Sequence, residues 1–182
     1  MNYSTDDELY QILLNSSFRF LSFRPRSEKE VRDFLRQKLQ KKKLDDPRML
    51  EKIMKRLADL EYLDDEKFAR WWLNQRRSHQ PKGNRIIIYE LQQKGVPREI
   101  IEMIINKEVC QSIPDRVQID IVPTEEEAAH IAIVKKLSLW KKLPKLARKQ
   151  KIYEYLARRG FSSDIIYPII DDIMKKDYNN SA

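Results

Sequence analysis

Two segments of the chain follow the same pattern, and this internal repeat constrains the fold more than any other feature. In each copy an amphipathic segment ends in a basic residue and a glycine, at Gly95 and at Gly160. A glycine in this place is typical of a helix C-terminus, because glycine adopts the left-handed conformation and the cation complements the helix dipole. Isoleucines follow at matching positions: Ile100, Ile101, Ile104 and Ile105 in one copy, and Ile165, Ile166, Ile169 and Ile170 in the other. The pattern predicts stacked helical units.

A third, weaker copy lies nearer the start of the chain. Three of its residues correspond to residues of the Gly95 copy: Val31 to Ile87, Leu35 to Leu91, and Lys38 to Lys94. Leu39 takes the place of the glycine, and a basic insertion precedes Pro47. Each such unit can bury its apolar face only against a neighbour, so three copies predict a tandem array.

The spacing of apolar residues is helical along most of the chain, and strand signals are few. We expect nine helices in three triplets, at about 6–20, 28–39, 47–60, 65–79, 84–94, 97–108, 124–137, 145–159 and 163–175. Pro168 falls inside the last of these helices and is expected to kink or shorten it. The predicted fold is therefore all-α, with three tandem three-helix repeats that form an elongated, curved array.

We place the first repeat at residues 1–61, the second at 62–108, and the third, with a C-terminal tail, at 124–182. Residues 109–123 form a linker between the last two repeats. Within it Val117, Ile119 and Ile121 alternate with polar residues, which predicts a short extended segment.

Several helix starts carry capping signals. Ser27 and Thr124 each have a glutamate three residues later, which predicts a capping box at both places. Asp64 is a predicted N-cap, and Pro47 is expected to open a helix.

The chain is basic, with 36 Lys and Arg against 28 Asp and Glu and a formal net charge of +8. Such an excess favours a polyanionic partner or an acidic protein surface. The single Cys110 cannot form an intramolecular disulfide, the apolar runs are short, and we expect no signal peptide. We expect a reduced, monomeric protein of the cytoplasm that binds no membrane.

Two long stretches are almost free of acidic residues. Residues 67–89 contain none, and residues 135–159 contain only Glu154. These stretches are candidate contact faces, although their cations can equally serve to solvate the outer faces of helices. Trp71 and Trp72 can stack on exposed bases or pack in the core, and we expect Trp72 to pack with Phe68.

Several motifs, in this order, resemble the RecX family of recombinase regulators. They are the segments 24–31 (RPRSEKEV), 62–69 (YLDDEKFA), 81–86 (PKGNRI) and 90–96 (ELQQKGV). The resemblance implies three tandem three-helix repeats, in agreement with the helical spacing. It also implies a protein that binds the RecA filament on single-stranded DNA and restrains its ATPase, strand-exchange and coprotease activities.

Basic residues in and near these motifs, and others in the acid-poor stretch 135–159, are the predicted contacts with a filament or DNA. We expect them at Arg24, Arg26, Arg70, Arg76, Arg77, Lys82, Arg85, Lys145, Arg148 and Lys149. Arg76, Arg77 and Arg85 flank the Lys82-Gly83 turn, where a backbone without side-chain bulk can approach a partner. Guanidinium groups suit contacts with carboxylates or phosphates.

The sequence offers little for catalysis. His79, His130 and Cys110 are isolated, and no phosphate-binding glycine loop or metal-ligand spacing occurs. We therefore expect no enzyme activity, no cofactor and no metal site. The alternative function is a basic helical module that binds DNA or RNA directly, and a steep dependence of its affinity on salt would distinguish it. The isoleucine-rich helices argue against that alternative, because we expect them to be buried.

Overall fold

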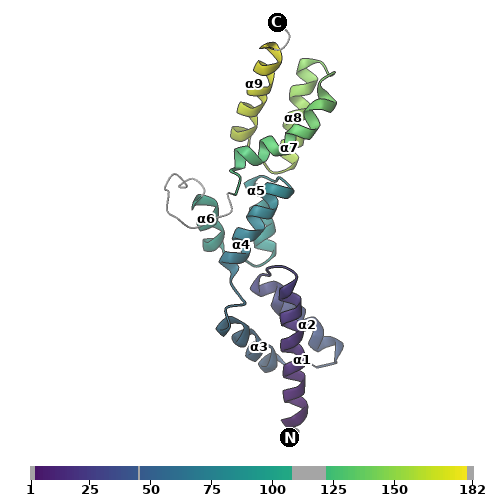
Figure 1. Ribbon diagram of the computed structural model, residues 1–182, viewed down its shortest axis with the longest axis vertical. Helices are drawn as coiled ribbons and strands as arrows, with labels where there is room; N and C mark the ends of the chain where they lie inside the picture. The colour runs from purple at the N-terminus through teal and green to yellow at the C-terminus, as the bar shows by residue number, and fades with distance from the viewer. Residues whose placement is uncertain (1–2, 45, 108–121, 180–182) are drawn as a thin grey trace. The chain divides into compact units, whose positions relative to one another are not determined.

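The computed structural model describes residues 3–44, 46–107 and 122–179, and all regular structure in these ranges is helical (Figure 1). The all-α prediction is confirmed. The described helices are α1 (Tyr3–Ser22), α2 (Glu28–Lys41), α3 (Pro47–Asp59), α4 (Asp65–Asn74), the π-helix η1 (Gln75–His79), α5 (Asn84–Gln93), α6 (Arg98–Lys107), α7 (Glu125–Trp140), α8 (Lys145–Arg158) and α9 (Ser163–Asn179).

Each predicted helix has a counterpart, and the differences lie at helix ends. The fourth predicted helix changes to π geometry after Asn74. The α9 helix runs through Pro168, so the proline does not shorten it. The predicted extended segment at 117–121 lies outside the described residues, and Val122 and Pro123 lie in a loop before α7.

The chain divides into two compact units. Unit 1 comprises Met1–Trp71 and Leu91–Ile104, and unit 2 comprises Trp72–Glu90 and Ile105–Ala182. The predicted bounds of the three repeats, and the elongated, curved form of the array, stay predictions.

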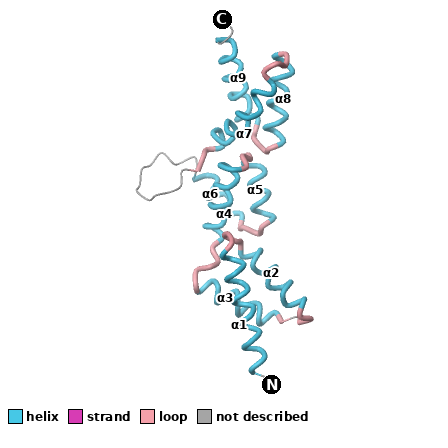
Figure 2. The backbone as a smooth tube through the Cα atoms, turned by 45° about the vertical axis from the view of Figure 1, so that its right-hand side comes forward, coloured by secondary structure: helices cyan, strands magenta, loops and turns pink. Residues whose placement is uncertain are grey.

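In unit 1, helices α1, α2 and α3 pack against one another (Figure 2). Their shared core is formed by Leu13, Leu14, Val31, Leu35, Leu39, Met49, Leu50, Ile53, Met54 and Leu57. Helix α2 contributes residues four apart and α3 residues three and four apart, as expected when one face of an amphipathic helix is buried, and α1 adds the adjacent Leu13 and Leu14.

In unit 2, helices α7, α8 and α9 pack around a second core, and η1 packs against α7. This core contains three alanines of α7 and larger side chains from α8, α9 and the turn between them, including Ile152, Leu156, Phe161 and Ile166. Small residues on α7 allow the other two helices to approach it closely.

The two glycines of the repeat end helices, as predicted. Gly95 and Gly160 have φ values of 77° and 85°, as a left-handed helix end requires. After each glycine the next residue donates its N–H to the carbonyl five residues earlier: Val96 to Leu91, and Phe161 to Leu156. The side chains of these four residues are all buried, so each turn packs against the helix that it ends.

The first copy makes the same turn without a glycine, four residues later than the alignment suggests. Leu39 stays helical and buried, and α2 continues to Lys41. Lys43 then adopts the left-handed conformation at φ 57°, and Leu44 donates its N–H to the carbonyl of Leu39. The turn geometry is therefore kept in all three copies.

The helix caps agree with prediction except at one side chain. Thr124 and Glu127 form a full capping box, and the Asp64 carboxylate accepts the N–H of Lys67 at 2.8 Å. Ser27 caps α2 by accepting the N–H of Glu30 at 3.2 Å. The reciprocal half of the predicted Ser27 capping box was wrong, because the Glu30 carboxylate binds Arg24 and Lys94 instead.

Candidate partner-binding surface

The ten predicted contact residues differ widely in exposure. Arg70, Arg85 and Lys145 are exposed; Arg24, Arg26, Arg76, Lys82 and Lys149 are half-buried; Arg77 and Arg148 are buried. The first group is therefore the most accessible to a partner. Of these, Arg70 forms an ion pair with Glu66 at 2.6 Å.

In unit 1, Glu30 is the centre of an ion cluster, which we call the Glu30 cluster. Arg24 donates two hydrogen bonds to its carboxylate, at 3.0 and 2.9 Å, and Lys94 donates a third at 2.7 Å. Burial alone would raise the pKa of Glu30, but the hydrogen bonds from Arg24 and Lys94 lower it to about 2. The guanidinium of Arg24, a predicted contact residue, is thus already bound to a carboxylate of the same chain.

Backbone contacts surround this cluster and attach the start of α2 to other segments of unit 1. The Ser27 hydroxyl donates to the Lys94 carbonyl at 2.7 Å, and the Lys29 amine donates to the Gln93 carbonyl at 3.0 Å. The N–H of Glu28 donates to Asp65 at 2.9 Å. Burial raises the pKa of Asp65. The segment 24–30 therefore stabilises the fold, in addition to any role in binding.

Arg26 lies beside this cluster. Its guanidinium is 4.0 Å from the centre of the Phe20 ring, a favourable cation–π distance. Burial and the neighbouring charge of Arg24 lower the pKa of Arg26.

In unit 2, Glu90 is the centre of a similar cluster. Its carboxylate accepts hydrogen bonds from Arg76 Nε at 2.7 Å, from Trp72 Nε1 at 2.9 Å, and from Lys82. The Arg76 guanidinium also lies 4.2 Å from the centre of the Trp72 ring. Burial would raise the pKa of Glu90, but these hydrogen bonds hold it below its usual range.

Trp71, for which the sequence left base stacking and core packing open, lies with its ring centre 6.1 Å from that of Phe68. The predicted packing of Trp72 on Phe68 stays a prediction, as does base stacking by either tryptophan.

Arg77 is fully buried and has no surface to offer to a partner, contrary to its selection as a favoured contact residue. Its guanidinium donates to the Pro123 carbonyl at 2.8 Å and to Asn84 Oδ1 at 2.7 Å. The N–H of Asn84 donates in turn to Glu125 at 2.8 Å. These four residues, the Arg77 cluster, connect η1, the start of α5 and the start of α7.

The glycine of the Lys82-Gly83 turn allows close approach within unit 2. Gly83 donates its N–H to the Arg159 carbonyl at 2.9 Å, and the Arg159 guanidinium donates to the Pro81 carbonyl at 3.0 Å. A Cβ atom at Gly83 would lie 2.3 Å from the Gly160 oxygen, which is too close for any side chain. The bare backbone therefore packs against the end of α8, whereas the sequence suggested that it meets a partner.

A groove of about 680 Å³ lies beside this turn, and we call it the basic groove. Residues from the end of η1, from the turn and from α5, α7 and α8 line it: Ser78, His79, Gln80, Pro81, Lys82, Ile86, Ile131, Ala132, Lys136, Tyr155, Arg158 and Arg159. Both stretches that are nearly free of acidic residues contribute to this lining. Of its cations only Lys82 was among the predicted contact residues. The shortage of acidic residues in both stretches was the signal for the others.

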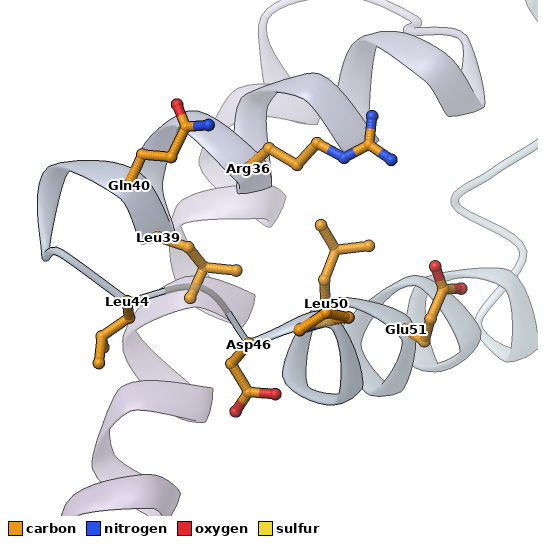
Figure 3. A pocket seen from close by; sticks show the side chains of 8 residues that line it. Arg36, Leu39, Gln40, Leu44, Asp46, Leu50 and Glu51 are labelled. Carbon is orange, nitrogen blue, oxygen red and sulfur yellow. The ribbon is translucent and has the colours of Figure 1, made fainter.

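A smaller cavity of about 300 Å³ lies between α2 and α3 in unit 1 (Figure 3). Leu39 and Leu50 project into the space between the two helices, and Arg36, Asp46 and Glu51 surround it. Charges of both signs line this cavity, so it has no preference for an anionic partner.

The described side chains bring no three His, Cys, Asp or Glu residues close enough together to hold a metal ion. Within residues 3–44, 46–107 and 122–179, no helix combines the length and the apolar character needed to cross a bilayer.

The fold and these surfaces define a class of protein: three-helix domains in tandem, with ion clusters inside the units and cations at a groove. Models of three successive domains match the chain in order, the first three-helix domain of RecX at residues 14–47, the second at 64–103 and the third at 124–170. The chain belongs to the RecX family.

Curated relatives support the same assignment. The chain is 34% identical to the regulatory protein RecX of Listeria welshimeri over 155 residues, which is 84% of this chain and 50% of that protein. It is also 34% identical to the regulatory protein RecX of Bacillus subtilis over 159 residues, 87% of this chain and 54% of that protein. The chain thus spans about half the length of the curated relatives it matches.

Solved structures share the fold. The crystal structure of RecX from Lactobacillus salivarius superposes with a TM-score of 0.69 at 23% identity, covering 90% of this chain and 95% of that one. A second crystal structure, of a regulatory protein RecX, has a TM-score of 0.67 at 23% identity and covers 90% of this chain and 73% of that one. The prediction of tandem three-helix domains is confirmed.

Proposed function

We propose that this protein binds the RecA filament on single-stranded DNA and inhibits the filament's ATPase, strand-exchange and coprotease activities. It acts by binding and catalyses no reaction. The observation that carries the proposal is the match to all three RecX domain models in their order along the chain. The relatives are named regulatory proteins, which supports a binding role. The proposal places the protein in the cytoplasm as a monomer, together with RecA.

Tandem domains suit a filament, because each domain can contact a different protomer and the weak contacts add through a high effective concentration. The net charge of +8 favours a partner whose surface carries DNA phosphates or acidic side chains. Among the predicted contact residues, Arg85 and Lys145 are exposed and belong to unit 2. They are the residues to test first, because Arg76 and Arg77 take part in internal clusters whose loss would disturb the fold.

We expect the protein to inhibit the single-stranded-DNA-dependent ATPase of its cognate RecA at less than one regulator per RecA protomer. The variant Arg85→Glu with Lys145→Glu should need about tenfold more protein for the same inhibition, since both reversals repel a polyanionic surface. The measurement is ATP hydrolysis by RecA as each protein is titrated in.

The matched control is Lys55→Glu with Arg56→Glu, which makes the same change of charge at two exposed residues of α3. It should inhibit within about twofold of the unchanged protein, because the contact residues are intact. If both variants lose inhibition of the RecA ATPase to the same extent, inhibition depends on the total charge of the protein and not on the positions of the charged residues. ATP turnover by the purified protein without RecA would contradict a role limited to binding.

The alternative function is direct binding of DNA or RNA, and the basic groove is the observation that favours it. Under that alternative the RecA ATPase would not change. Naked nucleic acid would be bound tightly, with log K falling by about 0.7 to 0.9 per neutralised phosphate against log salt.

A further inference from the structure

The basic groove gathers positive charge without a carboxylate in its lining. Lys82, Lys136, Arg158 and Arg159 line it, and none of its twelve lining residues is acidic. Cations that lie together repel one another, so such a groove attracts an anion from solution.

Within the described parts of the chain, a carboxylate pairs with only one of these cations. The carboxylate of Glu90 neutralises Lys82. Arg158 and Arg159, in contrast, donate hydrogen bonds to the carbonyls of Glu154 and Pro81, which carry no net charge. Lys136, Arg158 and Arg159 therefore form the electropositive part of the groove.

Apolar side chains line the rest of the groove. Ile86, Ile131, Ala132 and Tyr155 lie among the cations. The Arg159 guanidinium lies 4.7 Å from the centre of the Tyr155 ring, which keeps the cation and the aromatic side chain together. A ligand that fits this lining has regularly placed negative charges and flat apolar groups, which is the chemistry of a single nucleic-acid strand.

The wall formed by the turn is fixed in place. The hydrogen bonds of Gly83 and Arg159, together with the close approach of Gly83 to Gly160, attach residues 81–83 to the end of α8. The groove is therefore formed before any ligand binds, and its volume of about 680 Å³ lies within the usual range of about 300–1,000 Å³ for ligand sites.

We propose that the basic groove binds a segment of single-stranded DNA, with phosphates against Lys136, Arg158 and Arg159 and a base against Ile131 or Tyr155. This inference rests on the proposed function for its choice of DNA as the ligand. An acidic peptide fits less well, because helices and a turn line the groove and offer no strand edge with which an extended peptide could pair.

The test measures binding of a fluorescein-labelled oligothymidylate by fluorescence anisotropy, in the absence of RecA. We expect Lys136→Ala with Arg158→Ala to weaken binding at least tenfold. The slope of log K against log salt should become shallower by about 1.4, since each lost phosphate contact with a single strand contributes about 0.7. Circular dichroism of the variant checks that the helices are intact.

Lys55→Ala with Arg56→Ala is the matched control, because it removes the same charge from the exposed face of α3. Its affinity for the oligonucleotide should change less than about twofold. The inference is overturned if the groove variant binds like this control. It is also overturned if oligoglutamate displaces the labelled strand at a lower concentration of charge than unlabelled oligothymidylate does.

The RecA ATPase assay on the same proteins separates this inference from the proposed function. If the protein binds the oligonucleotide through the groove but does not inhibit RecA, the proposed function fails and the groove is a direct DNA site. If the protein inhibits RecA while the groove variant binds DNA unchanged, only the groove inference fails.

Discussion

Replacement of Arg77 by methionine is expected to lower the free energy of unfolding by about 3 kcal/mol. The guanidinium is fully buried and donates to the Pro123 carbonyl and to Asn84 Oδ1. Methionine fills much of the same volume but leaves both partly buried acceptors without this donor, and such a loss costs about 1–3 kcal/mol for each acceptor that is shielded from water. Urea denaturation followed by circular dichroism measures the change.

Arg85→Met is the control for this substitution. Arg85 is exposed at the start of the neighbouring helix α5, so the same chemical change should cost less than about 0.5 kcal/mol. Equal stability of the two variants would show that the Arg77 cluster does not stabilise unit 2.

A double-mutant cycle with Asn84→Ala tests the contact itself. If the hydrogen bond between the two side chains is formed, each single variant already loses it. The decrease in the free energy of unfolding of the double variant should therefore be smaller, by at least about 0.5 kcal/mol, than the sum of the decreases in the two single variants. Strict additivity would mean that Arg77 stabilises the protein only through its other contacts.

Local features of the fold could be predicted because neighbouring residues determine them. Gly95 and Gly160 marked helix ends, and the apolar stripes of the three copies marked the buried faces, with Val31, Ile87 and Leu91 all fully buried. Capping depends on residues three positions apart, so Asp64 and Thr124 could also be recognised.

The site was harder to predict, because its contacts join residues that are distant in sequence. Glu30 has the spacing of a capping box, yet the partner that competes for its carboxylate, Lys94, lies 64 positions away. Arg77 resembles the half-buried Arg76 beside it in sequence, and its burial depends on the approach of Pro123, which lies 46 positions away. The two basic stretches were visible, but nothing local indicated that they meet in one groove.

Replacement of Glu30 by glutamine is expected to lower the free energy of unfolding by about 2 kcal/mol at pH 7. The carboxylate accepts hydrogen bonds from Arg24 and Lys94, and its pKa falls from 4.5 to about 2. At about 1.36 kcal/mol per pKa unit the full shift is worth about 3 kcal/mol, and partial exposure to solvent reduces this value. Glu51→Gln, which alters an exposed ion pair with Arg32, should cost less than about 1 kcal/mol.

The dependence on pH gives the stricter test. Because the folded protein holds the pKa of Glu30 below its ordinary value, the stabilisation is complete above about pH 5 and is lost as the pH falls from 4.5 towards 2. The difference in stability between the unchanged protein and Glu30→Gln should therefore shrink to less than about half of its neutral value near pH 3. A difference that stays constant from pH 7 to pH 3 would mean that ionisation of Glu30 does not stabilise the fold, and that its side chain acts only by filling space beside Arg24 and Lys94.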